Sequence, residues 1–225
     1  DKNYLFTDGR YTIQSQMESG KYFKIISYEK ILNCNLFKNL KLGLDPKLFT
    51  HKQIKDYFLK NNKVKFLSNN LIDEIKTQKI LNNIPFFSLK DEIIGENSKS
   101  KINKITNYLK KNKADNLFVT APENVAWILN IRGGDGPNSP IPNSRLIINK
   151  SKKIYLITES YKAQKLIKEK IIKKKQLVIT SDLPKEILSL GGKNFIIDNK
   201  SCSIFYENII KSKFKIIKRE DPTYL

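Results

Sequence analysis

The chain has 225 residues, of which 40% are apolar and 10% aromatic, so it is long enough to bury the core of one large or two small domains. It contains no run of about 18 apolar residues, and its first residues lack the charged-then-apolar order of a signal peptide, so we expect a cytoplasmic chain with no membrane partner. Two distant cysteines and a single histidine argue against a disulfide scaffold or a multi-histidine metal site.

The formal net charge of +20 raises the possibility of nucleic-acid binding. Only four of the 42 basic residues are arginine, however, and sequence-reading proteins rely on arginine for bidentate contacts to guanine and phosphate. Together with the many isoleucines and asparagines, this lysine excess is typical of an AT-rich genome. We therefore expect no specific nucleic-acid partner, and we keep a basic RNA-binding module as an alternative.

In chain order, the first part of the sequence alternates short strands and helices. Asp8 can cap the first helix, and Gly20 can end it. Strands are predicted at residues 4–7, 23–26, 42–44 and 64–67, and helices at about 8–17, 31–40 and 50–60. This alternation indicates an α/β layer structure.

A polar stretch at residues 95–100 leads into a second part with the same logic, and we place the domain boundary near residue 92. Thr120 to Glu123 has the form of a capping box, and the helix that follows carries Trp127, which we expect to be a core anchor. Strands are predicted at 117–120, 145–149, 153–158, 177–180, 195–198 and 214–217, and helices at 98–112, 183–190 and 205–210. The strands at 145–149 and 153–158 should form an antiparallel hairpin in a mixed sheet that helices cover.

The loop at 132–144 contains three glycines and three prolines. It follows a helix and leads into a strand, which is the reverse of a phosphate-binding loop, so we expect glycines in backbone conformations closed to other residues. Cys34 and Cys202 lie in apolar patterns and should be buried small hydrophobes without nearby bases. The residues alone reveal no catalytic or metal-ligating residues.

Two motifs carry a family resemblance. Residues 5–11, Leu-Phe-Thr-Asp-Gly-Arg-Tyr, resemble the "DGRY" element of the N-terminal domain of Xaa-Pro aminopeptidases (aminopeptidase P, of the creatinase and prolidase superfamily). Residues 123–135 and the Asn138-Ser139-Pro140 that follows resemble the "IAWLLNLRGSD…NP" stretch of the second domain of that family. Leu44-Asp45-Pro46, residues 70–73 and Asp221-Pro222 fall in the same order as their family counterparts, so the resemblance spans the chain.

The resemblance implies an α/β chain with two creatinase/prolidase N-terminal-like domains, each a mixed sheet flanked by helices: residues 1–92, incomplete at its start, and residues 93–225. It also implies a C-terminal catalytic domain, which nothing in this chain matches, where two divalent metal ions, usually manganese, activate water. This chain would then hold no cofactor and no catalytic residue. Arg10, the arginine of the DGRY element, is the one substrate-binding residue that the resemblance implies.

The function expected from the resemblance is that of a non-catalytic N-terminal region of a metalloaminopeptidase. Its partners would be its own catalytic domain, a second copy in a homodimer, and peptide substrates with proline second. The same region of a prolidase or creatinase relative remains an alternative. For Arg10, a surface arginine neutralised by Asp8 or Glu18 is the competing interpretation.

Overall fold

The computed structural model describes residues 3–33, 38–75, 84–90, 92–136 and 138–224, and it separates into two compact units. The first unit comprises residues 1–45 and 51–68, and the second comprises residues 46–50 and 69–225. The compact units divide after residue 68, earlier than the predicted domain boundary near residue 92. The reason is that Phe86 is fully buried in the core of the second unit and that β5 (Phe87–Ser88) pairs with residues 131–132 of that unit. The boundary near residue 92 stays a prediction about domain organisation.

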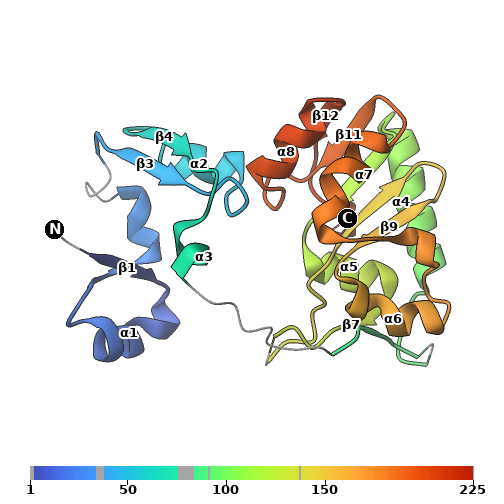
Figure 1. Ribbon diagram of the computed structural model, residues 1–225, viewed down its shortest axis with the longest axis horizontal. Helices are drawn as coiled ribbons and strands as arrows, with labels where there is room; N and C mark the ends of the chain where they lie inside the picture. The colour runs from blue at the N-terminus through green and yellow to red at the C-terminus, as the bar shows by residue number, and fades with distance from the viewer. Residues whose placement is uncertain (1–2, 34–37, 76–83, 91, 137, 225) are drawn as a thin grey trace. The chain divides into compact units, whose positions relative to one another are not determined.

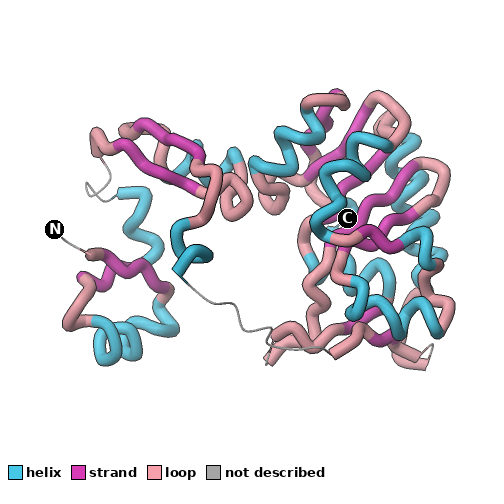
Figure 2. The backbone as a smooth tube through the Cα atoms, in the orientation of Figure 1, coloured by secondary structure: helices cyan, strands magenta, loops and turns pink. Residues whose placement is uncertain are grey.

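Two parallel strand pairs make up the described part of the first unit, each with a helix in its connection (Figures 1 and 2). In the first pair, η1 and α1 connect the strands; in the second, α2 does. Parallel strands need such a crossover, and a helix supplies it. The elements are β1 (Tyr4–Thr7), η1 (Gly9–Tyr11), α1 (Thr12–Ser19), β2 (Lys24–Ser27), η2 (Tyr28–Asn33), β3 (Lys41–Leu44), α2 (His51–Tyr57) and β4 (Lys63–Phe66).

The second unit is built on a six-stranded sheet with the strand order β10-β9-β8-β6-β11-β12. In addition, β5 and β7 form a separate two-stranded antiparallel sheet. The strands are β5 (Phe87–Ser88), β6 (Asn116–Val119), β7 (Ile131–Arg132), β8 (Arg145–Asn149), β9 (Ile154–Ile157), β10 (Leu177–Val178), β11 (Asn194–Ile197) and β12 (Lys215–Lys218). The helices are α3 (Leu71–Ile75), α4 (Ser98–Lys111), α5 (Pro122–Leu129), α6 (Ser160–Lys168), η4 (Lys174–Gln176), η5 (Thr180–Asp182), α7 (Leu183–Ser189), α8 (Ile204–Lys211) and η6 (Pro222–Tyr224).

Helices cover both faces of this sheet. Successive residues of a strand point to opposite sides, so alternate residues of the central strands enter different cores. Leu117 and Val119 of β6 join the core that contains residues of α4, α5 and α6, whereas Phe118 joins the core that contains residues of α7 and α8. Strands buried on both faces appear in the sequence as continuous apolar runs.

The α/β class and the mixed sheet are confirmed. Strands β6, β11 and β12 pair in parallel, as do β9 and β10, while β8 is antiparallel to both of its neighbours. The predicted hairpin is the β8–β9 pair. None of the described helices is long and apolar enough to cross a membrane.

The prediction of a capping box at Thr120 to Glu123 is wrong. Ala121 is the N-cap of α5, and no side chain caps that helix end. The hydroxyl of Thr120 is 2.7 Å from the hydroxyl of Ser201 instead, in the loop after β11. Pro122 at the first helical position begins the helix without needing a partner for a backbone N–H.

Candidate functional site

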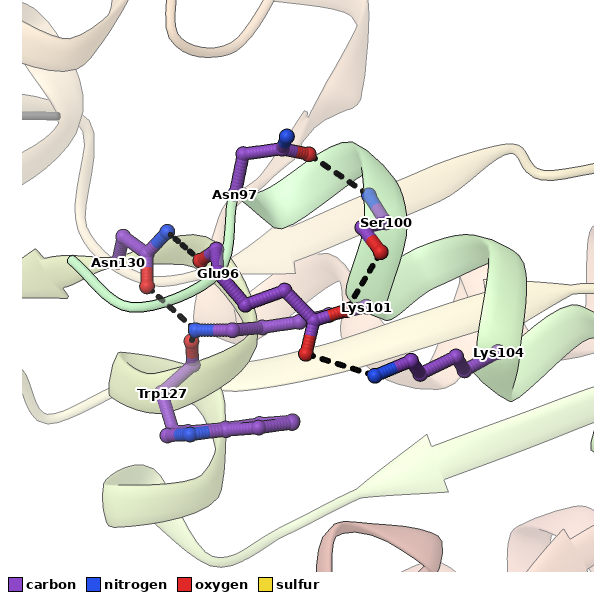
Figure 3. Close-up of polar contacts among 7 residues, drawn as sticks. All are labelled: Glu96, Asn97, Ser100, Lys101, Lys104, Trp127 and Asn130. Carbon is purple, nitrogen blue, oxygen red and sulfur yellow. Dashed lines mark hydrogen bonds and ion pairs between the residues drawn. The ribbon is translucent and has the colours of Figure 1, made fainter.

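Seven residues at the facing ends of α4 and α5 form a continuous polar network, which we call the Lys101 cluster (Figure 3). Its members are Glu96, Asn97, Ser100, Lys101, Lys104, Trp127 and Asn130. The side chain of Asn97 caps α4 by accepting the backbone N–H of Ser100 at 2.8 Å. This cap fixes where α4 starts, and therefore which of its residues face α5.

Lys101 is the centre of the cluster and is only 4% exposed. Its Nζ donates to the backbone carbonyl of Trp127 at 2.7 Å and to Oδ1 of Asn130 at 2.6 Å (Figure 3). Both acceptors lie at the carboxyl end of α5, where the helix dipole and the unpaired carbonyl groups favour a cation. The buried ammonium is therefore held by neutral acceptors at a helix end.

Asn130 connects three segments of the chain. It adopts a left-handed conformation with φ of 54° at the C-cap of α5, which asparagine tolerates better than most residues. Its Nδ2 donates to the carbonyl of Glu96 at 2.9 Å, and its own carbonyl accepts the N–H of Leu89 at 2.9 Å. The segment before α4 is thereby tied to the end of α5.

Burial, hydrogen bonds and nearby charges shift the pKa values of two residues of the cluster, Lys101 and Glu96. Burial lowers the pKa of Lys101, and the carboxylate of Glu96 acts in the opposite direction, while Arg132 and Lys104 lower it further. The pKa of Glu96 is lowered by the hydrogen bonds from Ser100 and Lys104. The ion pair between Lys104 Nζ and Glu96 Oε2 measures 2.9 Å.

The prediction that Trp127 is a core anchor is wrong, since its side chain is 44% exposed. The inner face of α5 is filled by Val125, Ile128 and Leu129, and Trp127 follows the exposed Glu123 by one helical turn on the outer face. Lys101 Nζ lies 4.2 Å from the centroid of the Trp127 rings, a cation–π contact that holds the indole in place.

The indole lines a pocket of about 410 Å³. The other side chains around it include Tyr108, Ile105, Pro222 and Thr223, together with the charged Glu96, Lys101 and Lys104. An aromatic and apolar wall with a charged rim is suited to holding a ligand or a protein segment. Among the described residues that line it, none is a nucleophile with an adjacent base.

Arg10, the site residue that the resemblance implied, lies in the first unit. Asp8 caps η1 as predicted: its Oδ1 accepts the backbone N–H of Arg10 at 2.9 Å. The guanidinium of Arg10 also forms a two-point contact with Asp8, Nε to Oδ1 at 3.2 Å and one terminal nitrogen to Oδ2 at 2.9 Å. These hydrogen bonds lower the pKa of Asp8 and raise that of Arg10. The part that Arg10 plays toward a substrate stays a prediction.

Contacts that the sequence did not reveal hold the described part of the loop at 132–144, which is residues 132–136 and 138–144. Asp135 forms an ion pair with Lys162, a 9% exposed residue of α6, and also accepts the backbone N–H of Asn143 at 2.6 Å. The expectation about its glycines is wrong, because Gly192 is the only described glycine with positive φ. Gly133 is required by space instead: a Cβ there would lie 2.8 Å from the Cα of Pro142.

Cys202 is fully buried, as predicted, and burial raises the pKa of its thiol to about 12. Such a thiol is not a nucleophile at neutral pH. Cys34 lies outside the described residues.

Comparison with known proteins places these features in a family. The model of the family described as "Creatinase/Prolidase N-terminal domain" matches residues 77–225. Xaa-Pro aminopeptidase 1 of Dictyostelium discoideum is 30% identical over 181 residues, which cover 71% of this chain and 29% of that protein. A probable Xaa-Pro aminopeptidase P of Laccaria bicolor is 31% identical over 157 residues, covering 63% of this chain and 24% of that protein.

Among solved structures, the X-prolyl aminopeptidase of Caenorhabditis elegans, described as a cytosolic enzyme with a di-nuclear active site, has the same fold over 97% of this chain and 39% of its own, with a TM-score of 0.76. Its sequence identity to this chain is 21%. The chain spans less than a third of the length of the two curated relatives described above.

Proposed function

The chain belongs to the Creatinase/Prolidase N-terminal domain family, and from that premise we propose that it is the non-catalytic N-terminal region of a Xaa-Pro aminopeptidase. The region shapes the access of peptides with proline second to a catalytic domain that holds two divalent metal ions, of which manganese is our choice. It also contributes to dimerisation of a cytosolic enzyme. The relatives support this proposal, because their names describe peptidases of this type.

The observation that carries the proposal is the fixed, outward-facing Trp127 inside the family-matched region. Leaving a large aromatic surface in water is unfavourable, so an exposed aromatic that its neighbours hold rigidly is typical of a binding surface. The buried charge of Lys101 lies beside the indole. Three hydrogen bonds of Lys101 and Asn130, together with the ion pair between Glu96 and Lys104, hold the surrounding residues in place. We therefore propose that the catalytic domain, with its bound peptide, packs against the pocket lined by Trp127.

The residues present do not fit the two metal ions themselves. Across the described ranges, no group of three or more histidine, cysteine, aspartate or glutamate side chains could hold a metal ion. When bound in the catalytic domain, the metals would supply the activated water, while this chain would bind and orient the peptide. Arg10 is our proposal for a residue that grips peptide oxygens, through the planar fork that it now offers to Asp8.

Dimerisation has its own supporting observation in α1. Ile13 and Met17 lie one helical turn apart on that helix, and they are 78% and 82% exposed. Exposed apolar side chains gathered on one helix face are typical of an interface between protein chains. A second copy of the enzyme is the partner that we propose for this face.

The proposal is tested with the protein from its complete reading frame, loaded with manganese and assayed on Xaa-Pro peptides. We expect turnover, with kcat/KM lowered about tenfold or more by Trp127→Ala, which corresponds to about 1.4 kcal/mol of transition-state binding. Leu188→Ala is the matched control, since Leu188 is also 44% exposed but lies on α7 away from the pocket. Trp127→Phe keeps a ring over Lys101 and should lose less activity.

Three outcomes would overturn the proposal. The first is a purified protein that does not turn over any Xaa-Pro peptide. The second is strict cleavage of dipeptides, which would identify a prolidase relative. The third is a Trp127→Ala variant that is folded by circular dichroism and as active as the Leu188→Ala control. A sequence-selective RNA complex that persists at physiological salt would instead favour the basic binding module.

A further inference from the structure

The second compact unit contains another pocket, which is lined by cations and hydroxyl groups and shares no residue with the Lys101 cluster. It encloses about 380 Å³ and is lined chiefly by Lys47, Arg145, Thr180, Ser181, Phe205 and Tyr206. The pocket lies at the end of the sheet where β9 and β10 finish and β8 begins. Arg145 is the first residue of β8, and it pairs with Ile157 at the end of β9. Ligands of open α/β sheets commonly bind at the carboxyl ends of strands.

Arg145 is held in this pocket without an acidic partner. It is half-buried, and its guanidinium carbon lies 5.2 Å from the centroid of the Tyr206 ring. Tyr206 is itself fixed by edge-to-face contacts with Phe118 at 5.5 Å and Phe205 at 5.1 Å. Within the part of the chain that the structure describes, no carboxylate forms an ion pair with Arg145, and no acceptor binds its five N–H donors.

The neighbouring acid does not compensate Arg145. Glu207 follows Tyr206 in α8, but its Oε1 forms an ion pair of 2.6 Å with Lys218. The described residues that line the pocket include no aspartate or glutamate. A half-buried guanidinium in such surroundings favours an external anion as its partner.

Lys47 is positioned by backbone contacts to α8. The N–H groups of Ile204 and Phe205, in the first turn of that helix, donate to the carbonyls of Phe49 at 2.9 Å and Pro46 at 3.0 Å. These bonds fix the segment 46–49 beside the helix, and they leave Lys47 Nζ 5.4 Å from the centroid of the Phe205 ring. Lys47 therefore lines the same pocket as Arg145.

Two hydroxyl donors complete the lining. Thr180 and Ser181 begin the short η5 turn, and neither hydroxyl has a hydrogen-bond partner among the described residues. Hydroxyl groups and a planar guanidinium fork together suit the oxygens of a tetrahedral or planar oxyanion.

We propose that this pocket is a binding site for a small anionic ligand, whose phosphate or carboxylate group is held by Arg145 and Lys47 and by the hydroxyls of Thr180 and Ser181. The volume of 380 Å³ fits a small metabolite and leaves the Phe205 ring to contact its apolar part. The site is independent of the Trp127 pocket, so it extends the function proposed above and does not depend on it.

The test is a calorimetric titration of the full chain with inorganic phosphate and, in a second arm, with citrate, each against sodium chloride of equal ionic strength. We expect saturable binding of at least one anion at one site. The two arms identify whether the group recognised is a phosphate or a carboxylate. Because the chain carries a net charge of +20, a specific site must be distinguished from general attraction of anions.

Variants make that distinction. Arg145→Gln should weaken binding at least tenfold, and Arg145→Lys should restore only part of it, since lysine lacks the fork. Lys175→Gln, at an exposed lysine outside the pocket, removes the same charge and should bind as the parent does. Thr180→Val, which keeps the side-chain shape, should weaken binding severalfold even if Arg145→Gln does not fold. Absence of saturation in both arms, or equal weakening by Lys175→Gln and Arg145→Gln, would overturn the proposal.

Discussion

The side chain of Asp115 lies directly against the backbone of Gly192. Its Oδ2 accepts the backbone N–H groups of Lys193 at 2.7 Å and Asn194 at 2.9 Å, and its Oδ1 accepts Lys150 Nζ at 2.6 Å. A Cβ on Gly192 would lie 2.4 Å from the Cβ of Asp115, and Gly192 has φ of +103°. This contact fixes the turn that delivers the chain into β11, and two predictions rest on it.

Gly192→Ala should destabilise the chain by about 2–3 kcal/mol, from backbone strain and from displacement of Asp115. The neighbouring Gly191→Ala is the matched control, because a Cβ there would meet nothing within 4 Å. Urea denaturation of both variants measures the difference. If Gly192→Ala has the same midpoint as Gly191→Ala, the described turn geometry is incorrect.

Asp115 should make stability depend on acid pH. Partial burial on its own would raise the pKa of this carboxyl, but the hydrogen bonds from Lys150, Asn194 and Lys193 outweigh it and lower the pKa from 3.8 to about 2. A folded-state pKa below the unfolded one gives stability that is present above about pH 4 and is lost as the pH falls through about 2, and the shift corresponds to about 2 kcal/mol. The unfolding free energy of the parent minus that of Asp115→Asn should therefore shrink between pH 5 and pH 2. A difference that stays constant over this range contradicts the prediction.

Lys101→Met should cost about 2–4 kcal/mol, because it leaves the carbonyl of Trp127 and the amide oxygen of Asn130 without their buried donor. Lys104→Met is the matched control on the same helix: its side chain is 70% exposed, and loss of its ion pair with Glu96 should cost no more than about 1 kcal/mol. Thermal unfolding gives both values. Trp127 is the only tryptophan, so its fluorescence should also change in Lys101→Met and remain as in the parent in Lys104→Met. Equal stability of the two variants would show that Lys101 is not buried in solution.

Arg10→Ala, in the protein from the complete reading frame, should raise KM for peptides that extend beyond the proline and leave KM for short peptides unchanged. The reason is the guanidinium fork, which can exchange Asp8 for peptide oxygens. Lys24→Ala, at an exposed lysine of the same unit, is the control for loss of one positive charge. Unaltered kinetics on long and short peptides alike would reduce Arg10 to the partner of Asp8.

The sequence predicted the layers of the second unit well, because β6 and β11 are apolar on both faces and the polar turn between β8 and β9 allows only a hairpin. It failed where a residue's partner comes from a distant segment. Thr120 has the form of a cap, but Ser201 offers its hydroxyl a partner 81 residues away.

The Lys101 cluster was missed because 38 lysines make each one resemble a solvated charge. A signal was present: Lys101 precedes the buried Ile105 by four residues and Leu109 by eight, so helical periodicity places it on the inner face of α4. Similarly, the exposed Glu123 one turn before Trp127 indicates the outer face of α5. The Asp135–Lys162 pair had no comparable signal, because a loop carries no periodicity.

Residues 46–50 belong to the second compact unit although they lie between two segments of the first. A truncated chain that starts at Asn69 would therefore lose the carbonyls of Pro46 and Phe49, which accept the first N–H groups of α8. Adding these residues back as a separate peptide should restore protection of the Ile204 and Phe205 amides from hydrogen exchange. The second unit is thus discontinuous in the sequence, and it can be excised whole only as two pieces of chain.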